Sequence, residues 1–224
     1  MSKKRDDAAK TFDGEAVYGP LKAIDLVKAT ATAKFDETVE ASFNLGIDPK
    51  QAEQGVRGTV ALPHGTGKNV RVLAFAEGEH ARAAQAAGAA LVGGAELAAA
   101  IAAGTQPLDW DVTIAHPSMM AEVGKLGKAL GPRGLMPNPK AGTVTPDVGK
   151  AVKEFRGGRV EYRNDRFGNV AVGIGKVSFT AAQLRENLAT LVGEINRVKP
   201  SSSKGRYVKK MTLSSTMGLG VHVD

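Results

Sequence analysis

Polar and apolar residues alternate along residues 38–45, TVEASFNL. A period of two puts every second side chain on the same side, which is typical of a strand with one buried face. The residues on that predicted buried face are Val39, Ala41, Phe43 and Leu45. The same alternation predicts half-buried strands at residues 159–163, 170–177 and 207–215. Residues 55–62, which Pro63 follows, are predicted to be an antiparallel partner of residues 38–45.

Two segments between and beside these strands have apolar residues at helical spacing. Pro20 suits the first turn of a helix, and apolar residues recur at helical spacing after it, so a helix is predicted from Pro20 to about residue 33. Residues 181–198 predict an amphipathic helix. Its apolar side carries Leu184, Leu188, Leu191, Val192 and Ile195. The polar residues 1–19 are predicted to form a mobile arm with an early helix.

The middle of the chain has a different character. Residues 69–76, NVRVLAFA, are apolar enough for a strand that is covered on both faces. Short apolar strands and alanine-rich helices then alternate, which indicates βαβ units and a parallel sheet. The successive segments are residues 77–88, 91–94, 95–103 and 111–115, followed by a helical pattern from Pro117. A helix is also predicted at residues 146–155, with Pro146 near its first position and Gly157 and Gly158 ending it.

These patterns predict two domains of different fold class. The outer domain, residues 1–65 and 157–224, is α+β and discontinuous, an antiparallel sheet with helices. The inserted domain, residues 66–156, is α/β and Rossmann-like, with a parallel sheet. The two chain crossings, at residues 63–68 and 157–158, are rich in glycine and are predicted to form a hinge.

Composition narrows the class of protein. The 224 residues are 42% hydrophobic and include no cysteine, which excludes a disulfide scaffold and suits a reducing compartment. No signal-peptide core or membrane-spanning run is present, so a soluble intracellular protein without a membrane partner is expected. The net charge of +7 favours a polyanionic partner. Residues 157–224 hold eleven basic and five acidic residues, so the outer domain should carry that surface.

Catalytic patterns are missing from the sequence. The four histidines, His64, His80, His116 and His222, are scattered and show no metal-ligand spacing. Residues 65–68 (GTGK) resemble a phosphate-binding loop, but Leu62 stands where that motif needs glycine and Asn69 where it needs serine or threonine. We therefore expect no enzyme activity, no metal and no cofactor.

Nucleic-acid binding is better supported by the residues. One side of the strand at 207–215 is predicted to present Lys210, Thr212, Ser214 and Thr216. A cation and hydroxyl groups on a strand suit phosphate and 2′-OH contacts, although an ordinary solvated strand face would have the same residues. Arg163, Asn164 and Arg166 occupy a turn suited to phosphate contact, and Lys176 is predicted to extend that patch.

For two apolar residues the sequence leaves two roles possible. Phe35 follows Lys34 at a helix-to-strand junction, where it would either pack on a ribose or base or plug the end of the helix. Met217 would either pack in the core or offer an adaptable apolar surface beside Gly218.

A loop is predicted at residues 131–144, GPRGLMPNPKAGTV, because three prolines and three glycines exclude helix and central strand. It carries Arg133 and Lys140 without an acidic residue. The loop is either a rigid connector or a second, weaker surface of the inserted domain.

This loop resembles the signature of the L-one family of large-subunit ribosomal proteins, which forms the mobile stalk beside the tRNA exit site. Further segments that resemble the family are residues 34–40 (KFDETVE), 159–166 (RVEYRNDR) and 215–218 (STMG). The resemblance implies a hinged two-domain fold. Within it, the weaker surface that carries Arg133 and Lys140 would either close on the other domain or meet tRNA. The resemblance also implies that Thr216, Met217 and Gly218 contact rRNA and that Lys34, Phe35 and Thr38 join the same surface. Family members often carry histidine where Ala171 stands here.

The resemblance implies a non-enzymatic protein that binds 23S-type rRNA in the large ribosomal subunit and assists the release of deacylated tRNA from the exit site. It further implies that the protein represses translation by binding its own messenger RNA, and that it is cytoplasmic and ribosome-bound. Two rival functions remain open at this point: a nucleotide-dependent enzyme built on the inserted domain, and a protein that coats any nucleic acid.

Overall fold

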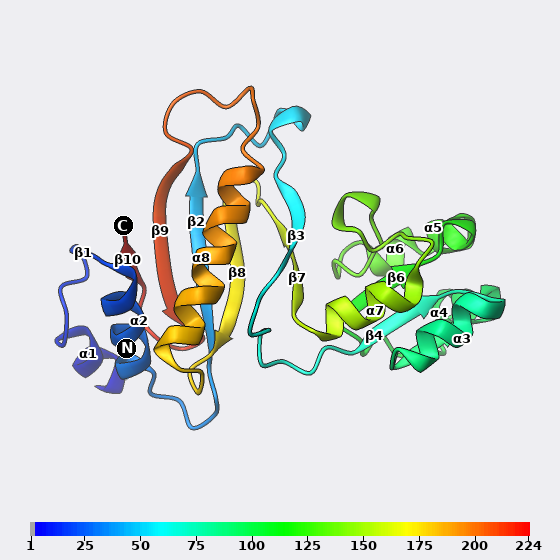
Figure 1. Cartoon of the computed structure of the whole chain (residues 1–224), viewed down its shortest axis with the longest axis horizontal. Coiled ribbons are helices and arrows are strands. Elements are labelled where there is room, and N and C mark those ends of the chain that lie inside the picture. The colour runs from blue at the N-terminus through cyan, green and yellow to red at the C-terminus, as the bar shows by residue number, and fades with distance from the viewer. Residues whose placement is uncertain (1–2) are drawn as a thin grey trace. The chain divides into compact units, whose positions relative to one another are not determined.

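The computed structural model describes residues 3–224. By their internal contacts these residues divide into two compact units (Figure 1). Unit 1 comprises the chain up to Lys68 together with Val160–Asp224, and unit 2 comprises Asn69–Arg159. These boundaries lie three residues from the predicted ones.

Unit 1 is built on a five-stranded sheet in the order β1-β10-β9-β2-β8. These strands are β1 (Val17–Tyr18), β2 (Thr38–Leu45), β8 (Asn169–Lys176), β9 (Val208–Ser215) and β10 (Val221–Val223). Strand β2 is central and pairs antiparallel with β8 and β9, whereas β1 and β10 pair in parallel. The helices of the unit are α1 (Lys3–Ala9), α2 (Pro20–Thr30), the 3₁₀ turn η1 (Ala52–Gln54) and α8 (Ala181–Arg197).

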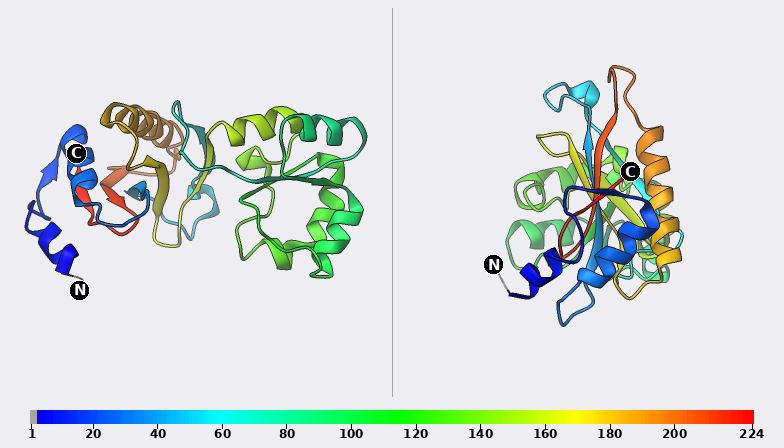
Figure 2. Two further views of the ribbon diagram at one scale, coloured as in Figure 1. Left: turned by 90° about the horizontal axis from the view of Figure 1, so that it is seen from below. Right: turned by 90° about the vertical axis from the view of Figure 1, so that its left-hand side faces the viewer.

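Helices α2 and α8 cover one face of this sheet, as Figure 2 shows for α8. The core between them contains Ile24, Phe43, Leu188 and Leu213, all buried. The alternation predicted for residues 38–45 is confirmed, because their burial alternates along β2. The opposite face of the sheet carries the polar residues of β2, β8 and β9; we call it the open face.

One predicted strand pairing is wrong. The segment predicted as the partner of β2 forms β3 (Arg57–Ala61), which pairs with β7 (Arg159–Arg163) in a separate two-stranded sheet. Strand β2 is already paired on both sides, with β8 and β9. The predicted polar arm at the N-terminus contains α1 and β1, so Val17 and Tyr18 belong to the sheet. Residues 1 and 2 of that arm lie outside the described residues.

A buried amide ties the beginning of the first crossing segment, residues 64–65, to the rest of unit 1. Asn187 of α8 is 0% exposed. Its side chain accepts from the backbone N–H of His64 at 3.1 Å and donates to the carbonyl oxygens of Gly65 and Ile174, at 2.9 and 2.8 Å. Residues 64–65 are therefore fastened to both α8 and β8.

Replacing this amide should destabilise unit 1. Asn187→Ala leaves the His64 N–H and the carbonyl groups of Gly65 and Ile174 without this partner, and we expect the free energy of unfolding to fall by about 2 kcal/mol. The measurement is denaturant unfolding. Asn196→Ala, an exposed asparagine on the same helix, is the control and should change it by less than about 0.5 kcal/mol. Equal stability of the two variants would contradict the assignment.

Unit 2 contains a three-stranded parallel sheet in the order β5-β4-β6. The strands are β4 (Val72–Phe75), β5 (Leu91–Gly93) and β6 (Val112–Ala115). The helices are α3 (Gly78–Ala86), α4 (Ala95–Ala102), α5 (Met120–Lys125), α6 (Gly127–Leu130) and α7 (Val148–Arg156), with 3₁₀ turns η2 (Pro117–Met119) and η3 (Pro139–Ala141). Side chains of β4 contribute to two separate cores, one with α3 and α7 and one with α4, α5 and α6. Figure 2 shows helices on both faces of this sheet.

The start of α7 differs from its prediction. Pro146 does not occupy the first helical position, because Asp147 caps the helix and Val148 begins it. The Asp147 carboxylate accepts from the backbone N–H of Lys150 at 3.0 Å. A side-chain acceptor at this position satisfies a free N–H group of the first turn, which explains the later start.

Candidate nucleic-acid interface

Two segments far apart in sequence meet at one end of the open face. They are residues 34–38, which lead into β2, and residues 215–218, which end β9; we call them together the ridge. The backbone N–H of Thr38 donates to the Thr216 hydroxyl at 3.0 Å, and that hydroxyl lies 3.4 Å from the Thr38 carbonyl oxygen. Thr216 therefore links the two segments of the ridge instead of standing free.

Glu37 lies beneath the ridge and is only 1% exposed. One carboxylate oxygen accepts from the Ser215 hydroxyl at 2.7 Å and from the Met217 N–H at 2.9 Å. The other oxygen accepts from the Ala33 N–H at 2.9 Å. Burial acts to raise the pKa of Glu37, but these donors outweigh it and hold the pKa below its ordinary value. An ionised carboxylate thus fastens both segments of the ridge.

Above this carboxylate the ridge presents two apolar side chains to solvent. Phe35 is 57% exposed and Met217 is 60% exposed. The predicted alternatives, a helix plug for Phe35 and core packing for Met217, are therefore wrong. Exposed aromatic and thioether groups on a rigid backbone suit contact with a base or a ribose.

Lys34 and Lys176 supply the cations of the ridge region. Lys34 is exposed. The ammonium group of Lys176 donates to the Thr38 hydroxyl at 2.9 Å and lies 3.4 Å from the Asp36 carbonyl oxygen. Asp36 in turn accepts from the Ser178 hydroxyl at 2.7 Å, a bond that lowers the pKa of its carboxyl. Lys176 is thus held in place at the end of β8.

The turn at residues 163–166 lies at the other end of the open face. It leads into Asn169, the first residue of β8, whereas Lys176 is the last residue of β8 and pairs with Thr38. Seven residue steps along a strand span roughly 23 Å. The prediction that Lys176 extends the patch of this turn is therefore wrong.

The side chains of this turn have different surroundings. Arg163 and Arg166 are exposed, and the Arg166 guanidinium lies 4.9 Å from the centre of the Phe167 ring. Asn164 faces the protein, where its side-chain oxygen accepts from the Val56 N–H at 2.8 Å and its amide donates to the Asp165 carbonyl at 2.8 Å. Asn164 shapes the turn, so only the two arginines are available for phosphate contact.

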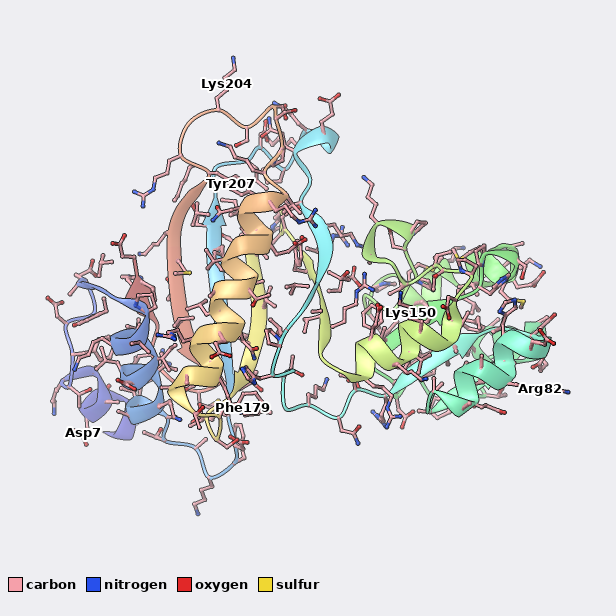
Figure 3. All side chains as sticks on the ribbon, viewed as in Figure 1. Asp7, Arg82, Lys150, Phe179, Lys204 and Tyr207 are labelled. Carbon is pink, nitrogen blue, oxygen red and sulfur yellow. The ribbon has the colours of Figure 1, made fainter. Side chains whose placement is uncertain are left out.

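Strand β9 connects the two ends of the open face. Lys210 is exposed, Thr212 and Ser214 are half-buried, and Met211 between them points into the core. The Thr212 hydroxyl lies 3.1 Å from a ring nitrogen of His222 on β10. The loop before β9 carries further cations, with Lys204 at its tip (Figure 3). The predicted strand side therefore forms a continuous polar surface.

In unit 2, the loop at residues 131–144 packs against the edge of the parallel sheet. Thr143 and Val144 bridge to Ala115, with the Ala115 N–H donating to the Thr143 carbonyl at 2.9 Å. Leu135 lies in the core. Gly142 has a φ of 64°, which only glycine adopts freely. These contacts give the apolar residues and glycines of the loop a structural role, which is to hold the loop against the sheet.

The cations of this loop face outward. Lys140 is exposed, and the exposed Arg133 places a guanidinium nitrogen 3.4 Å from the Leu108 carbonyl oxygen. A role of either residue toward tRNA or toward unit 1 stays a prediction.

The described residues contain no cluster of three or more side chains able to hold a metal ion. His80 and His116 stack at a centroid distance of 4.3 Å, but they have no third ligand among these residues. Within residues 3–224 no helix has both the length and the apolar composition needed to span a membrane.

Glu37 is the residue of this surface that the sequence did not reveal. An acidic residue just before a strand is normally expected to face solvent. A search for residues that bind a polyanion considers basic side chains and passes over acidic ones. A signal was available, since Glu37 stands one residue before a strand whose odd positions are buried. Strict alternation would have placed its side chain on the buried face.

Comparison with known proteins gives a consistent result. Residues 27–219 match the model of the Ribosomal protein L1p/L10e family. The chain is 55% identical over 223 residues to the large ribosomal subunit protein uL1 of Nocardioides sp., an alignment that covers 100% of this chain and 92% of that protein. Both matches include the ridge and the open face. The chain therefore belongs to the ribosomal protein L1p/L10e family, among the bacterial-type uL1 proteins.

Proposed function

We propose that this protein binds 23S-type rRNA of the large ribosomal subunit through the ridge and the open face of unit 1. The observation that carries the proposal is the ridge itself. A buried carboxylate fixes two chain segments so that Phe35 and Met217 project beside a surface of hydroxyl and ammonium groups. Structured RNA is recognised by such combinations of base or ribose stacking with 2′-OH and phosphate contacts.

The RNA-binding residues of this proposal form three groups. The ridge contributes Lys34, Phe35, Thr38, Lys176, Thr216, Met217 and Gly218. Strand β9 contributes Lys210, Thr212 and Ser214. The turn contributes Arg163 and Arg166, with Asn164 shaping it. Preorganisation of the ridge lowers the entropic cost of binding, because its segments are ordered before RNA arrives.

In the ribosome, we propose that the protein is part of the mobile stalk and assists the release of deacylated tRNA from the exit site. Units 1 and 2 would then be hinged domains, with unit 2 moving near the departing tRNA. Arg133 and Lys140 are the outward-facing cations that would meet tRNA or unit 1. We also propose that the same RNA surface binds the protein's own messenger RNA and represses its translation. These roles rest on family membership.

The proposal assigns a structural, non-enzymatic role on the ribosome in the cytoplasm. The family match names ribosomal proteins, and the relative is itself named as a large-subunit protein. A nucleotide-dependent enzyme would instead give unit 2 measurable affinity for a nucleotide. A general coating protein would bind all RNAs of one length equally.

The test compares binding to fragments of 23S-type rRNA with binding to random RNA of equal length, at about physiological salt. We expect a strong preference for one fragment. Met217→Ala should weaken that binding by about 10-fold through lost apolar contact, and Thr216→Val should do the same by breaking the link to Thr38. Leu21→Ala removes an exposed apolar side chain from α2 and is the control.

Equal binding of the parent protein to every RNA would contradict the proposal. Loss of preference in the Leu21→Ala control would show that any exposed apolar residue of unit 1 has this effect, and would remove the ridge from the proposal.

A further inference from the structure

The open face contains a hollow between the ridge and the turn at residues 163–166. It has a volume of about 330 Å³. The residues that line it are Ser42, Phe43, Asn44, Asn169, Lys210 and Thr212. We infer that this hollow holds one unpaired nucleobase of the RNA and that the side-chain amide of Asn44 reads its edge. The inference rests on the proposed function, which it extends to residues outside the predicted site.

Two side chains fix the orientation of the Asn44 amide. Its Nδ2 donates to Oδ1 of Asn169 at 2.7 Å, and Nδ2 of Asn169 donates to a carboxylate oxygen of Asp165 at 3.0 Å. The other Asp165 oxygen accepts from the backbone N–H groups of Phe167 and Asn169, both at 2.8 Å. An ionised acceptor at the end of this series defines the direction of every hydrogen bond in it.

This arrangement leaves Asn44 with one N–H donor and its amide oxygen for a ligand. A side-chain amide has two N–H donors and one oxygen, and only one N–H of Asn44 is used in the series. A neighbouring donor and acceptor match the edge of a nucleobase, and asparagine pairs with adenine in this way. Unpaired RNA bases are commonly recognised by hydrogen bonds to their edges.

The neighbours of Asn44 complete a nucleotide-sized site. Asn44 pairs with Lys210 on β9 and with Asn169 on β8, and both partners line the hollow. This exposed cation suits the phosphate of the same nucleotide, and the hydroxyls of Ser42 and Thr212 suit its ribose. The volume lies at the small end of ligand sites, as expected for one base.

The experiment uses the full chain and the 23S-type rRNA fragment that the parent protein prefers. Each unpaired nucleotide of the fragment is replaced in turn by an abasic one, and dissociation constants are measured for parent, Asn44→Ala and Asn44→Thr. Threonine favours strands and keeps β2 intact while it removes the amide. Asn196→Ala, on the opposite side of the sheet core, is the matched control.

We expect both Asn44 variants to bind the intact fragment roughly 5- to 150-fold more weakly, the range for one specific base contact. One abasic position should weaken the parent and the control by a similar factor and leave the Asn44 variants unaffected. The abasic position that weakens binding of the parent but not of the Asn44 variants identifies the base in the hollow.

Unchanged affinity of both Asn44 variants would overturn the inference and leave the proposed function standing. Equal effects of every abasic position on parent and variants would also overturn it. A parent protein that prefers no fragment would overturn the proposed function, and the inference with it.

Discussion

Replacement of Glu37 by alanine should weaken binding to the preferred rRNA fragment by about 100-fold. The substitution leaves the Ser215 hydroxyl and the N–H groups of Ala33 and Met217 without their acceptor. The Ser215 hydroxyl is buried, and a buried donor that loses its partner costs about 1–3 kcal/mol, so the ridge should rearrange to regain bonds to water. Phe35 and Met217 would then no longer project from a fixed backbone.

Glu37→Gln separates this effect from general unfolding. Glutamine keeps the volume but has one acceptor oxygen, so it can serve Ala33 or the pair Ser215 and Met217, not both. We expect an intermediate loss of affinity, about 10-fold, with a folded protein by circular dichroism. Glu53→Gln, an exposed acid of unit 1, should bind RNA as the parent does. Parent-like affinity of Glu37→Ala would contradict the role given to the carboxylate.

The same carboxylate makes stability depend on pH. Because the pKa of Glu37 in the folded protein is below its ordinary value of 4.5, its contribution is fully present above pH 4.5 and is lost as the pH falls through the folded value. Denaturant unfolding of the parent should therefore show a decline in this acidic range. Glu37→Gln should show a smaller decline.

Gly218→Val is the second change for which we expect a large effect, again about 100-fold in affinity for the rRNA fragment. A Cβ atom built at Gly218 would lie 2.3 Å from the Ser215 hydroxyl oxygen, which is too close for any real contact. That oxygen is the donor to Glu37, and the Gly218 N–H also donates to the Ser215 carbonyl at 3.1 Å. A side chain at position 218 should therefore open the turn and move Met217.

Gly193→Ala is the matched control, because nothing lies within 4 Å of a Cβ atom at that position on α8. It should leave RNA affinity unchanged and raise the free energy of unfolding by about 0.5–1 kcal/mol through helix propensity. Affinities are measured with the fragment and with random RNA. If Gly218→Val bound the fragment as tightly as the control does, the close contact at this turn would be irrelevant to the interface.

The sequence predicted element types well where burial follows a simple period. Strand β2 begins and ends at its predicted residues, and α8 ends one residue early. The partner of β3 was missed because alternation identifies a buried face and contains no information about which strand lies beside it. The short strands β1 and β10, of two and three residues, are below the length at which a period can be recognised.

The candidate site was predictable only where it follows from the alternation within one strand. The exposed polar side of β9 follows from alternation alone. The separation of Lys176 from Arg166 depends on strand direction and register, which only the paired sheet defines. Glu37 and Asn44 act through hydrogen bonds to residues more than a hundred positions away, and such pairs leave no mark on local sequence.

The order of strands in the five-stranded sheet has a consequence for synthesis of the chain. Strand β2 is made early, but its two neighbours, β8 and β9, begin at residues 169 and 208. At about 5–20 residues per second, the segment TVEASFNL would wait for several seconds or longer as an unpaired apolar strand on the nascent chain. Unit 2 is continuous and can complete its contacts during that interval. The open face and the ridge are therefore assembled last, after residue 218 has been made, so a chain truncated before β9 would lack the surface that we propose for RNA.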